Sequence, residues 1–169
     1  MDLINPDHRS IATEDIAHHL ANIARFNGAT DSFYSVAAHS WYCSMIVKNY
    51  GPEVQLLALM HDAAEAYLGD VTSPLKCLLR EYQHLERRMW YAIADAYGLN
   101  RSLPPCVKEA DTRAYVKERM HLISSRNMMD DPDAAQFEDV KVPALALPGP
   151  DVDAKQLFLD RYYELRGMR

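Results

Sequence analysis

The sequence has no long hydrophobic run and few cysteines, and these scarcities exclude whole classes of protein. No stretch approaches the roughly 18 consecutive apolar residues of a membrane helix, so we expect no membrane partner. Residues 1–6 are too polar for a secretory signal peptide, which predicts a cytoplasmic protein. The three cysteines, Cys43, Cys77 and Cys106, have no CxxC spacing and are predicted to be small buried side chains in a reducing compartment.

Acidic residues also outnumber basic residues in this sequence. The formal net charge of −6 argues against a surface that coats nucleic acid, so we expect no nucleic-acid partner. It leaves room for a small anionic substrate, because a few cations can focus on one pocket. A length of 169 residues with 49% hydrophobic and 25% charged residues is typical of one soluble globular domain covering residues 1–169.

The chain shows no alternating strand pattern, internal repeat or low-complexity segment. Apolar residues instead recur at helical spacing, which predicts an all-α bundle with a core over about residues 13–123. The predicted helices cover residues 13 to 25–28, 34–49, 52–70, 74–97 and a segment that begins at 103–105.

Capping residues mark several of these boundaries. Thr13 is predicted as an N-cap followed by acids in the first turn, and Ser73-Pro74 as the cap and first residue of another helix. Gly98 is predicted to end that helix. Four prolines predict an irregular loop over residues 126–150, serving as a lid or a contact surface. Asp151 is predicted to cap a final helix over residues 151–167.

Residues 56–70 form the stretch around which the chain is organised. It begins as an apolar helical run and then places His61 and Asp62 side by side, with Glu65 one turn after the histidine and Asp70 beyond it. An imidazole and a carboxylate at the end of a buried helix are costly unless something binds them. We therefore predict an active site here.

Four side chains are candidate ligands of one divalent ion: His39, His61, Asp62 and Asp111. Two imidazoles and two carboxylates suit Mn²⁺, Co²⁺, Fe²⁺ or Ni²⁺, with Zn²⁺ and Mg²⁺ as further candidates. Taken singly, each residue has a plainer explanation, because a His-Asp pair often occurs by chance. His39 alone fits a hydrogen-bonded core histidine, and Asp111 alone fits a solvated helix acid.

A family resemblance links these four residues. The order His39, His61-Asp62, Asp111 resembles the signature of the HD-domain metal-dependent phosphohydrolases. The similarity is closest to the small 5′-deoxynucleotidases and to the phage dATP triphosphohydrolases. It runs over residues 16–115, and its motifs are Arg25-Phe26-Asn27-Gly28, Phe33 to Ser40, His61 to Glu65, Gly69-Asp70, Ser73 to Lys76 and Lys108 to Asp111. The resemblance implies an HD-type bundle in the cytosol of a bacterium or a phage-infected cell.

The resemblance also implies catalytic roles. The ion would polarise a phosphoryl oxygen and acidify a water. Glu65 matches the family's acid that orients or deprotonates the attacking water, and Asp70 matches a second acid that positions water or protonates the leaving oxygen. The plainer explanation for both is capping or solvated charge.

Substrate contacts follow from the same resemblance. Arg25, Lys76 and Lys108 match phosphate-contacting positions, although cations at helix ends are usually solvated. Phe26 stands where relatives often carry Trp against the sugar, and its plainer role is packing in the core. Three cations suit a triphosphate better than a monophosphate.

These features predict hydrolysis of a deoxynucleotide, first dATP (or another dNTP) to deoxynucleoside and triphosphate, with a 5′-deoxynucleotidase acting on dNMPs as the alternative. The competing class is a non-catalytic regulator that binds a metal or nucleotide. A cyclic-nucleotide phosphodiesterase is disfavoured, because the later histidines His84 and His121 are expected on helix surfaces. Small HD relatives commonly assemble, so a homo-oligomer is expected.

Overall fold

The computed structural model describes residues 2–124 and 139–168, and these residues are mostly helical. In chain order the helices and 3-10 turns are η1 His8–Ser10, α1 Thr13–Asn22, η2 Arg25–Gly28, α2 Val36–Ile46, α3 Pro52–Met60, α4 Glu65–Leu68, α5 Ser73–Lys76, α6 Arg80–Tyr97, α7 Pro105–Leu122 and α8 Ala154–Leu165. The described residues form no strand, only an isolated antiparallel bridge between Ala24 and Ser35. The prediction of one all-α domain is confirmed.

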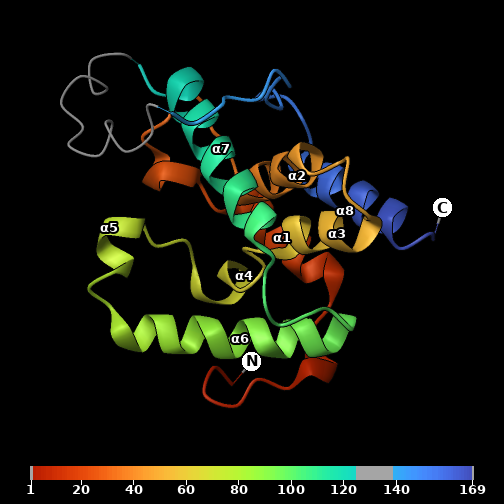
Figure 1. The fold of residues 1–169 in the computed structure, drawn as a ribbon. Helices are drawn as coiled ribbons and strands as arrows, with labels where there is room; N and C mark the ends of the chain where they lie inside the picture. Colours follow the sequence, from red (N-terminus) through yellow and green to blue (C-terminus); the bar gives the residue numbers. More distant parts are fainter. Residues whose placement is uncertain (1, 125–138, 169) are drawn as a thin grey trace.

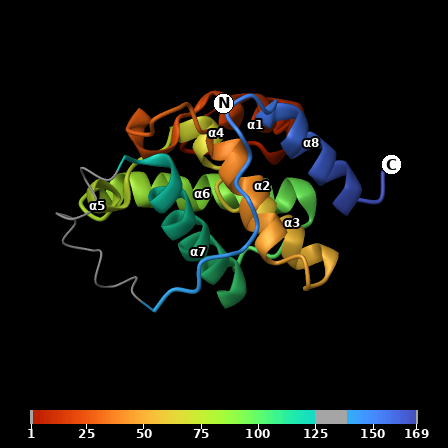
Figure 2. The ribbon, with the colours of Figure 1, turned by 90° about the horizontal axis from the view of Figure 1, so that it is seen from above.

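Helix α2 is the centre of this bundle. It packs against α1, α3, α7 and α8, which Figures 1 and 2 show gathered around it, while α6 runs along one side of the molecule. Its side chains are apolar on nearly all sides, and Val36, Ala37, Tyr42 and Cys43 are fully buried. A helix enclosed by neighbours has no solvated face. A polar residue such as His39 therefore needs a partner inside the protein.

The first helix differs from prediction at both ends. Thr13 is the first residue of α1 and not its cap, because Ala12 has the extended backbone of the N-cap. The Thr13 hydroxyl lies 3.0 Å from the hydroxyl of Tyr97 instead. The acids Glu14 and Asp15 lie in the first turn, as expected. Helix α1 ends at Asn22, earlier than predicted.

The segment Arg25–Gly28 is a separate tight turn, η2. The Arg25 N–H donates to the Tyr34 carbonyl at 2.9 Å, which ties the turn to the start of α2. Phe26 and Asn27 have φ of 54° and 52°, in the left-handed region. Non-glycine residues held there cost of order 1 kcal/mol or more each, so packing must hold this turn in place. Helix α2 is also shorter at both ends than the predicted 34–49.

Two predicted helices are each broken in two. The one over 52–70 becomes α3 and α4, because residues 61–64 form turns in which Ala63 N–H bonds to Met60 and Glu65 N–H to Asp62, both at 2.9 Å. These three-residue hydrogen bonds are tighter than those of an α-helix. The one over 74–97 becomes α5 and α6, with a break at 77–79. The first break places His61 at the C-cap of α3 rather than inside a helix.

Other boundaries are partly confirmed. Gly98 ends α6 in the left-handed conformation with φ of 65°, as predicted. Ser73 is the first residue of α5 and not its cap, which is Thr72. Asp151 does not cap the last helix. Asp153 does, because its carboxylate accepts from the Gln156 N–H at 3.0 Å. Of the predicted loop over 126–150, residues 126–138 lie outside the described residues, and 139–150 form no helix.

The cysteines were only partly predicted. Cys43 is buried, but Cys77 is exposed and Cys106 is intermediate, so burial of all three is wrong. None of the three forms a disulfide. Within residues 2–124 and 139–168, no helix has both the length and the apolar character needed to cross a bilayer.

Candidate metal centre

The four predicted ligands converge where α2, the end of α3 and α7 meet. The Nε2 atom of His39 lies 3.2 Å from Asp111 Oδ1, and the Nε2 atom of His61 lies 3.2 Å from Asp62 Oδ2. The cross distances are similar, at 3.6 Å from His39 Nε2 to Asp62 Oδ2 and 3.9 Å from His61 Nε2 to Asp111 Oδ1. Residues from three distant parts of the sequence therefore point their polar atoms into one small volume.

His61 offers a direct test of whether this cluster fits a metal ion. Its Nδ1 lies 2.8 Å from the Ala58 carbonyl oxygen. Because a carbonyl can only accept, Nδ1 carries the proton of this hydrogen bond. The Nε2 atom is buried and has no hydrogen-bond partner among the described residues. A buried imidazole nitrogen that faces two carboxylates is suited to a cation, so the donor set fits a divalent metal.

Cys43 is a fifth potential donor, which was not predicted from the sequence. It lies one helical turn after His39 on α2, and its Sγ is 3.5 Å from His39 Nε2. The donor atoms of His39, Cys43, His61 and Asp111 all lie within 4.8 Å of one another. These residues could hold a metal ion. The i, i+4 spacing from His39 was the sequence signal for Cys43.

Electrostatics pair the imidazoles with the carboxylates. Burial opposes the charged form of every one of these groups. The neighbouring acids nevertheless raise the pKa of His39 and of His61 well above the ordinary histidine value. The two histidines in turn lower the pKa of Asp62 and of Asp111 below the ordinary aspartate value. The acids thus stabilise positive charge at the point where an ion would bind.

Glu65, at the start of α4, is a buried carboxyl beside this cluster. Only 3% of the residue is exposed, and its Oε2 has no hydrogen-bond partner among the described residues. Burial, followed by the charges of Asp62 and Asp70, raises the pKa of Glu65 to about 9. Burial also raises the pKa of Asp70. Two acids that hold protons more tightly than usual therefore lie near the predicted ligands.

Arg25 reaches the same region from η2. Its Nη2 donates to Glu118 Oε2 at 3.1 Å, and its guanidinium lies 5.3 Å from the centre of the Phe26 ring. The Phe26 ring packs in turn on Tyr115, with 5.6 Å between ring centres. Burial opposes the charge of Arg25, but Glu118, Asp62 and other carboxylates raise its pKa. The predicted cation is close to the cluster, and Phe26 packs beside it.

The two predicted lysines differ in their surroundings. Lys76 Nζ lies 2.7 Å from Glu86 Oε1 on α6 and 3.6 Å from Glu65 Oε1. Its pKa is raised: burial opposes the charge, but the bond to Glu86 outweighs this. Lys108 is exposed on α7, and the described residues give its ammonium no ion pair. The structure thus places Lys76 near Glu65. Lys108 is related to the cluster only by its position on α7, one turn before Asp111.

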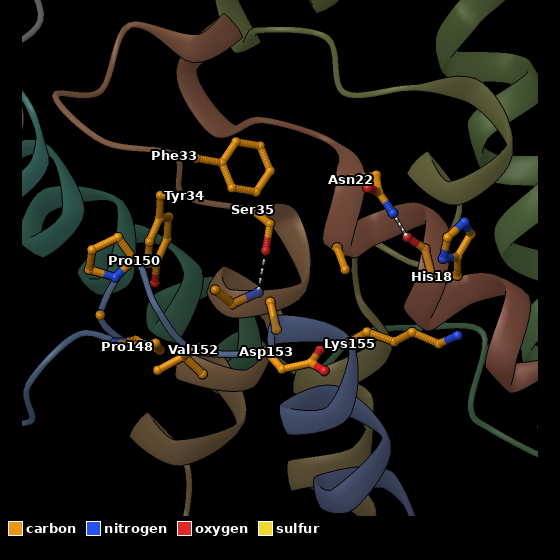
Figure 3. A pocket seen from close by; sticks show the side chains of 14 residues that line it. His18, Asn22, Phe33, Tyr34, Ser35, Pro148, Pro150, Val152, Asp153 and Lys155 are labelled. Atoms are coloured by element: carbon orange, nitrogen blue, oxygen red, sulfur yellow. Dashed lines mark hydrogen bonds between the residues drawn. The ribbon is translucent and has the colours of Figure 1, made fainter.

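A separate cavity of about 300 Å³ lies on another side of α2. Figure 3 shows it between α1, the segment leading into α2 and the segment before α8, with His18, Tyr34, Ser35, Pro150 and Lys155 in its lining. The described residues that line it include none of the predicted ligands or catalytic acids. It is distinct from the cluster described above.

Comparisons with known proteins find relatives in two bacteria and assign no activity. No family model matches the chain. The chain is 43% identical over 121 residues, or 72% of its length, to the uncharacterized protein YfdR of Escherichia coli K12. It is 39% identical over 117 residues, or 65% of its length, to an uncharacterized protein of Rhodobacter capsulatus. The chain spans 65% and 60% of the lengths of these two relatives.

Proposed function

We propose that this protein is a divalent-metal-dependent phosphohydrolase of the HD type that acts on deoxynucleotides. The observation that carries the proposal is the convergence of the four predicted ligands beside a buried acid and a buried arginine. The atoms concerned are those of His39, His61, Asp62, Asp111, Glu65 and Arg25. The geometry fits the order of residues that resembles the HD signature.

Each side chain has a distinct task in this proposal. His39, His61, Asp62 and Asp111 would hold the ion, which when bound supplies Lewis-acid polarisation of a phosphoryl oxygen. Arg25 would bind a phosphate oxygen through its guanidinium. Glu65 and Asp70 would exchange protons with the attacking water and the leaving oxygen. Burial raises the pKa of both carboxyls, to about 9 for Glu65, so each holds a proton more tightly than an ordinary acid and can donate it.

The same bond would break in either candidate reaction. Water oxygen bonds to the α-phosphorus, the bond from that phosphorus to the 5′ oxygen breaks, and the 5′ oxygen takes a proton. From dATP the products are deoxyadenosine and triphosphate; from a dNMP they are deoxynucleoside and phosphate. The two substrates differ in the β- and γ-phosphates, which only the dNTP carries. Binding of these phosphates by Lys76 and Lys108 would therefore favour the dNTP over the dNMP.

The first candidate is dATP triphosphohydrolase, supported by three cations on different elements: Arg25, Lys76 and Lys108. The second candidate, a 5′-deoxynucleotidase, is favoured by the pairing of Lys76 with Glu86 at 2.7 Å. An ammonium already paired with a carboxylate contributes less to binding outer phosphates, because its charge is partly compensated.

A product panel tests the proposal. Wild-type protein with Mn²⁺ or Co²⁺ is incubated with the four dNTPs and the four dNMPs, and the products are separated by ion-exchange chromatography. Triphosphate and deoxyadenosine from dATP are the expected result. Activity confined to dNMPs would replace the first candidate by the second. If the metal-loaded protein cleaves neither set, the enzyme proposal fails and the binding-regulator class takes its place.

Phe26 is expected to disfavour a 2′-hydroxyl. An apolar wall discriminates against an added hydroxyl by up to about 100-fold, so hydrolysis of dATP should exceed that of ATP by up to this factor. Phe26→Ala should reduce the ratio, measured as kcat/KM for each substrate.

Phe33→Ala is the matched control, because Phe33 is an aromatic residue that is 55% exposed and lines the separate cavity. Its substitution should leave the ratio unchanged. Equal kcat/KM values for dATP and ATP in the wild-type protein would contradict the assigned role of Phe26.

A further inference from the structure

Glu118 is a fully buried carboxylate to which the sequence assigned no role. It lies on α7 with no exposed surface. Its Oε1 accepts a hydrogen bond from His39 Nδ1 at 2.6 Å, and its Oε2 accepts one from Arg25 Nη2 at 3.1 Å. Each oxygen thus serves a different residue of the candidate site. Burying a carboxylate is costly unless it is paired and hydrogen-bonded, and both conditions are met here.

The placement of Glu118 on α7 explains how it reaches His39. It follows Asp111 by seven residues, or about two helical turns, so both acids lie on nearly the same face of the helix. Asp111 lies 3.2 Å from Nε2 of His39 while Glu118 lies 2.6 Å from Nδ1. Helix α7 therefore contacts both nitrogens of the His39 imidazole. Nε2 faces the cluster, and Nδ1 faces away from it.

We propose that Glu118 is a positioning residue that fixes the orientation of His39 for metal binding and holds Arg25 beside the metal centre. Its part toward Arg25 rests on the proposed function, whereas its part toward His39 requires only that the cluster binds a metal. The bond from His39 Nδ1–H to Oε1 directs Nε2 to the cluster and increases the basicity of that nitrogen. The bond to Arg25 keeps the guanidinium from turning away.

The proposal is tested by metal affinity, measured by calorimetric titration of the full-length chain with Mn²⁺ and with Co²⁺. Glu118→Gln keeps the size of the side chain but removes its charge. It also places an amide N–H₂ against either His39 or Arg25, each of which needs an acceptor. Loss of such an outer partner typically weakens metal binding by about 10–100-fold, which is the expected increase in Kd.

Glu109→Gln is the matched control, since Glu109 is an exposed glutamate on the same helix, two residues before Asp111. Its Kd for Mn²⁺ should equal that of the wild type. A thermal melt of each variant separates stability from affinity. If Glu118→Gln is folded and less stable but binds Mn²⁺ with the wild-type Kd, Glu118 is merely structural and the proposal is overturned.

A second measurement does not depend on the variant folding. Long-range ¹H–¹⁵N spectra of Zn²⁺-loaded wild-type protein report which nitrogen of His39 carries the proton. A proton on Nδ1 with Nε2 bound to the ion supports the proposal, and metal on Nδ1 overturns it. Metal binding with these features but without hydrolysis of any nucleotide would refute the proposed function and leave the role of Glu118 toward His39 intact.

Discussion

Substitution of His61 by alanine is expected to abolish both divalent-metal binding and nucleotide hydrolysis. His61 Nε2 lies 3.2 Å from Asp62 Oδ2, is buried and has no hydrogen-bond partner among the described residues. Its loss removes a direct donor, so the effect should exceed the roughly 10–100-fold loss that follows removal of an outer partner. Asp62→Ala should behave in the same way. Hydrolysis should fall to the background rate.

His84→Ala provides the control, because His84 is exposed on α6, outside the cluster. Titration with Mn²⁺ and a hydrolysis assay on the same samples give the two readouts, and circular dichroism verifies that the variants are folded. Retention of wild-type Kd and rate by folded His61→Ala would contradict the assignment of this residue as a ligand.

Glu65→Gln is expected to stabilise the metal-free protein at alkaline pH while it slows the reaction. The pKa of Glu65 is about 9 in the folded protein against an ordinary 4.5. From pH 4.5 to 9 the unfolded chain releases this proton while the folded protein keeps it. Wild-type stability therefore falls as pH rises, by up to about 1.4 kcal/mol per pH unit, and the contribution is fully present only below pH 4.5.

The glutamine variant lacks this dependence, so its advantage in unfolding free energy should grow from pH 5 to 8 by up to about 4 kcal/mol. Urea denaturation with EDTA at several pH values measures it, with Glu81→Gln, an exposed glutamate on α6, as the control. Loss of an acid–base group should lower kcat by roughly 100- to 10,000-fold. A difference in stability that does not change with pH would contradict the buried, protonated state of Glu65.

The course of the helices was predictable because apolar spacing and a few strong stop signals determine it. Gly98 ends α6 and the prolines before residue 106 begin α7, as expected. The breaks at 61–64 and 77–79 were not predictable, because no glycine or proline lies in either segment. These breaks depend on tertiary packing, which overrides the high helix propensity of Ala63 and Ala64.

The site was predictable only in part. The meeting of His39, His61 and Asp111 was expected from the resemblance, not from periodicity, because spacing along one helix says nothing about where another helix packs. Cys43 and Glu118 were not predicted, although each shares a helix face with a predicted ligand. Cys43 lies one turn after His39, and Glu118 lies two turns after Asp111. The pairing of Lys76 with Glu86 joins two helices and has no signal in the sequence.

The bonds of Glu118 also bear on how the chain folds. The bond to His39 spans 79 positions of the sequence, and the bond to Arg25 spans 93. Each therefore closes a long loop of the chain, which costs conformational entropy. We expect contacts of such high sequence separation to form late, after local helices and the apolar faces of α2 and α7 have met. Interactions absent from the folding transition state act mainly on the unfolding rate. We therefore expect the buried carboxylate of Glu118 to act mainly on the lifetime of the native state and little on how fast that state is reached.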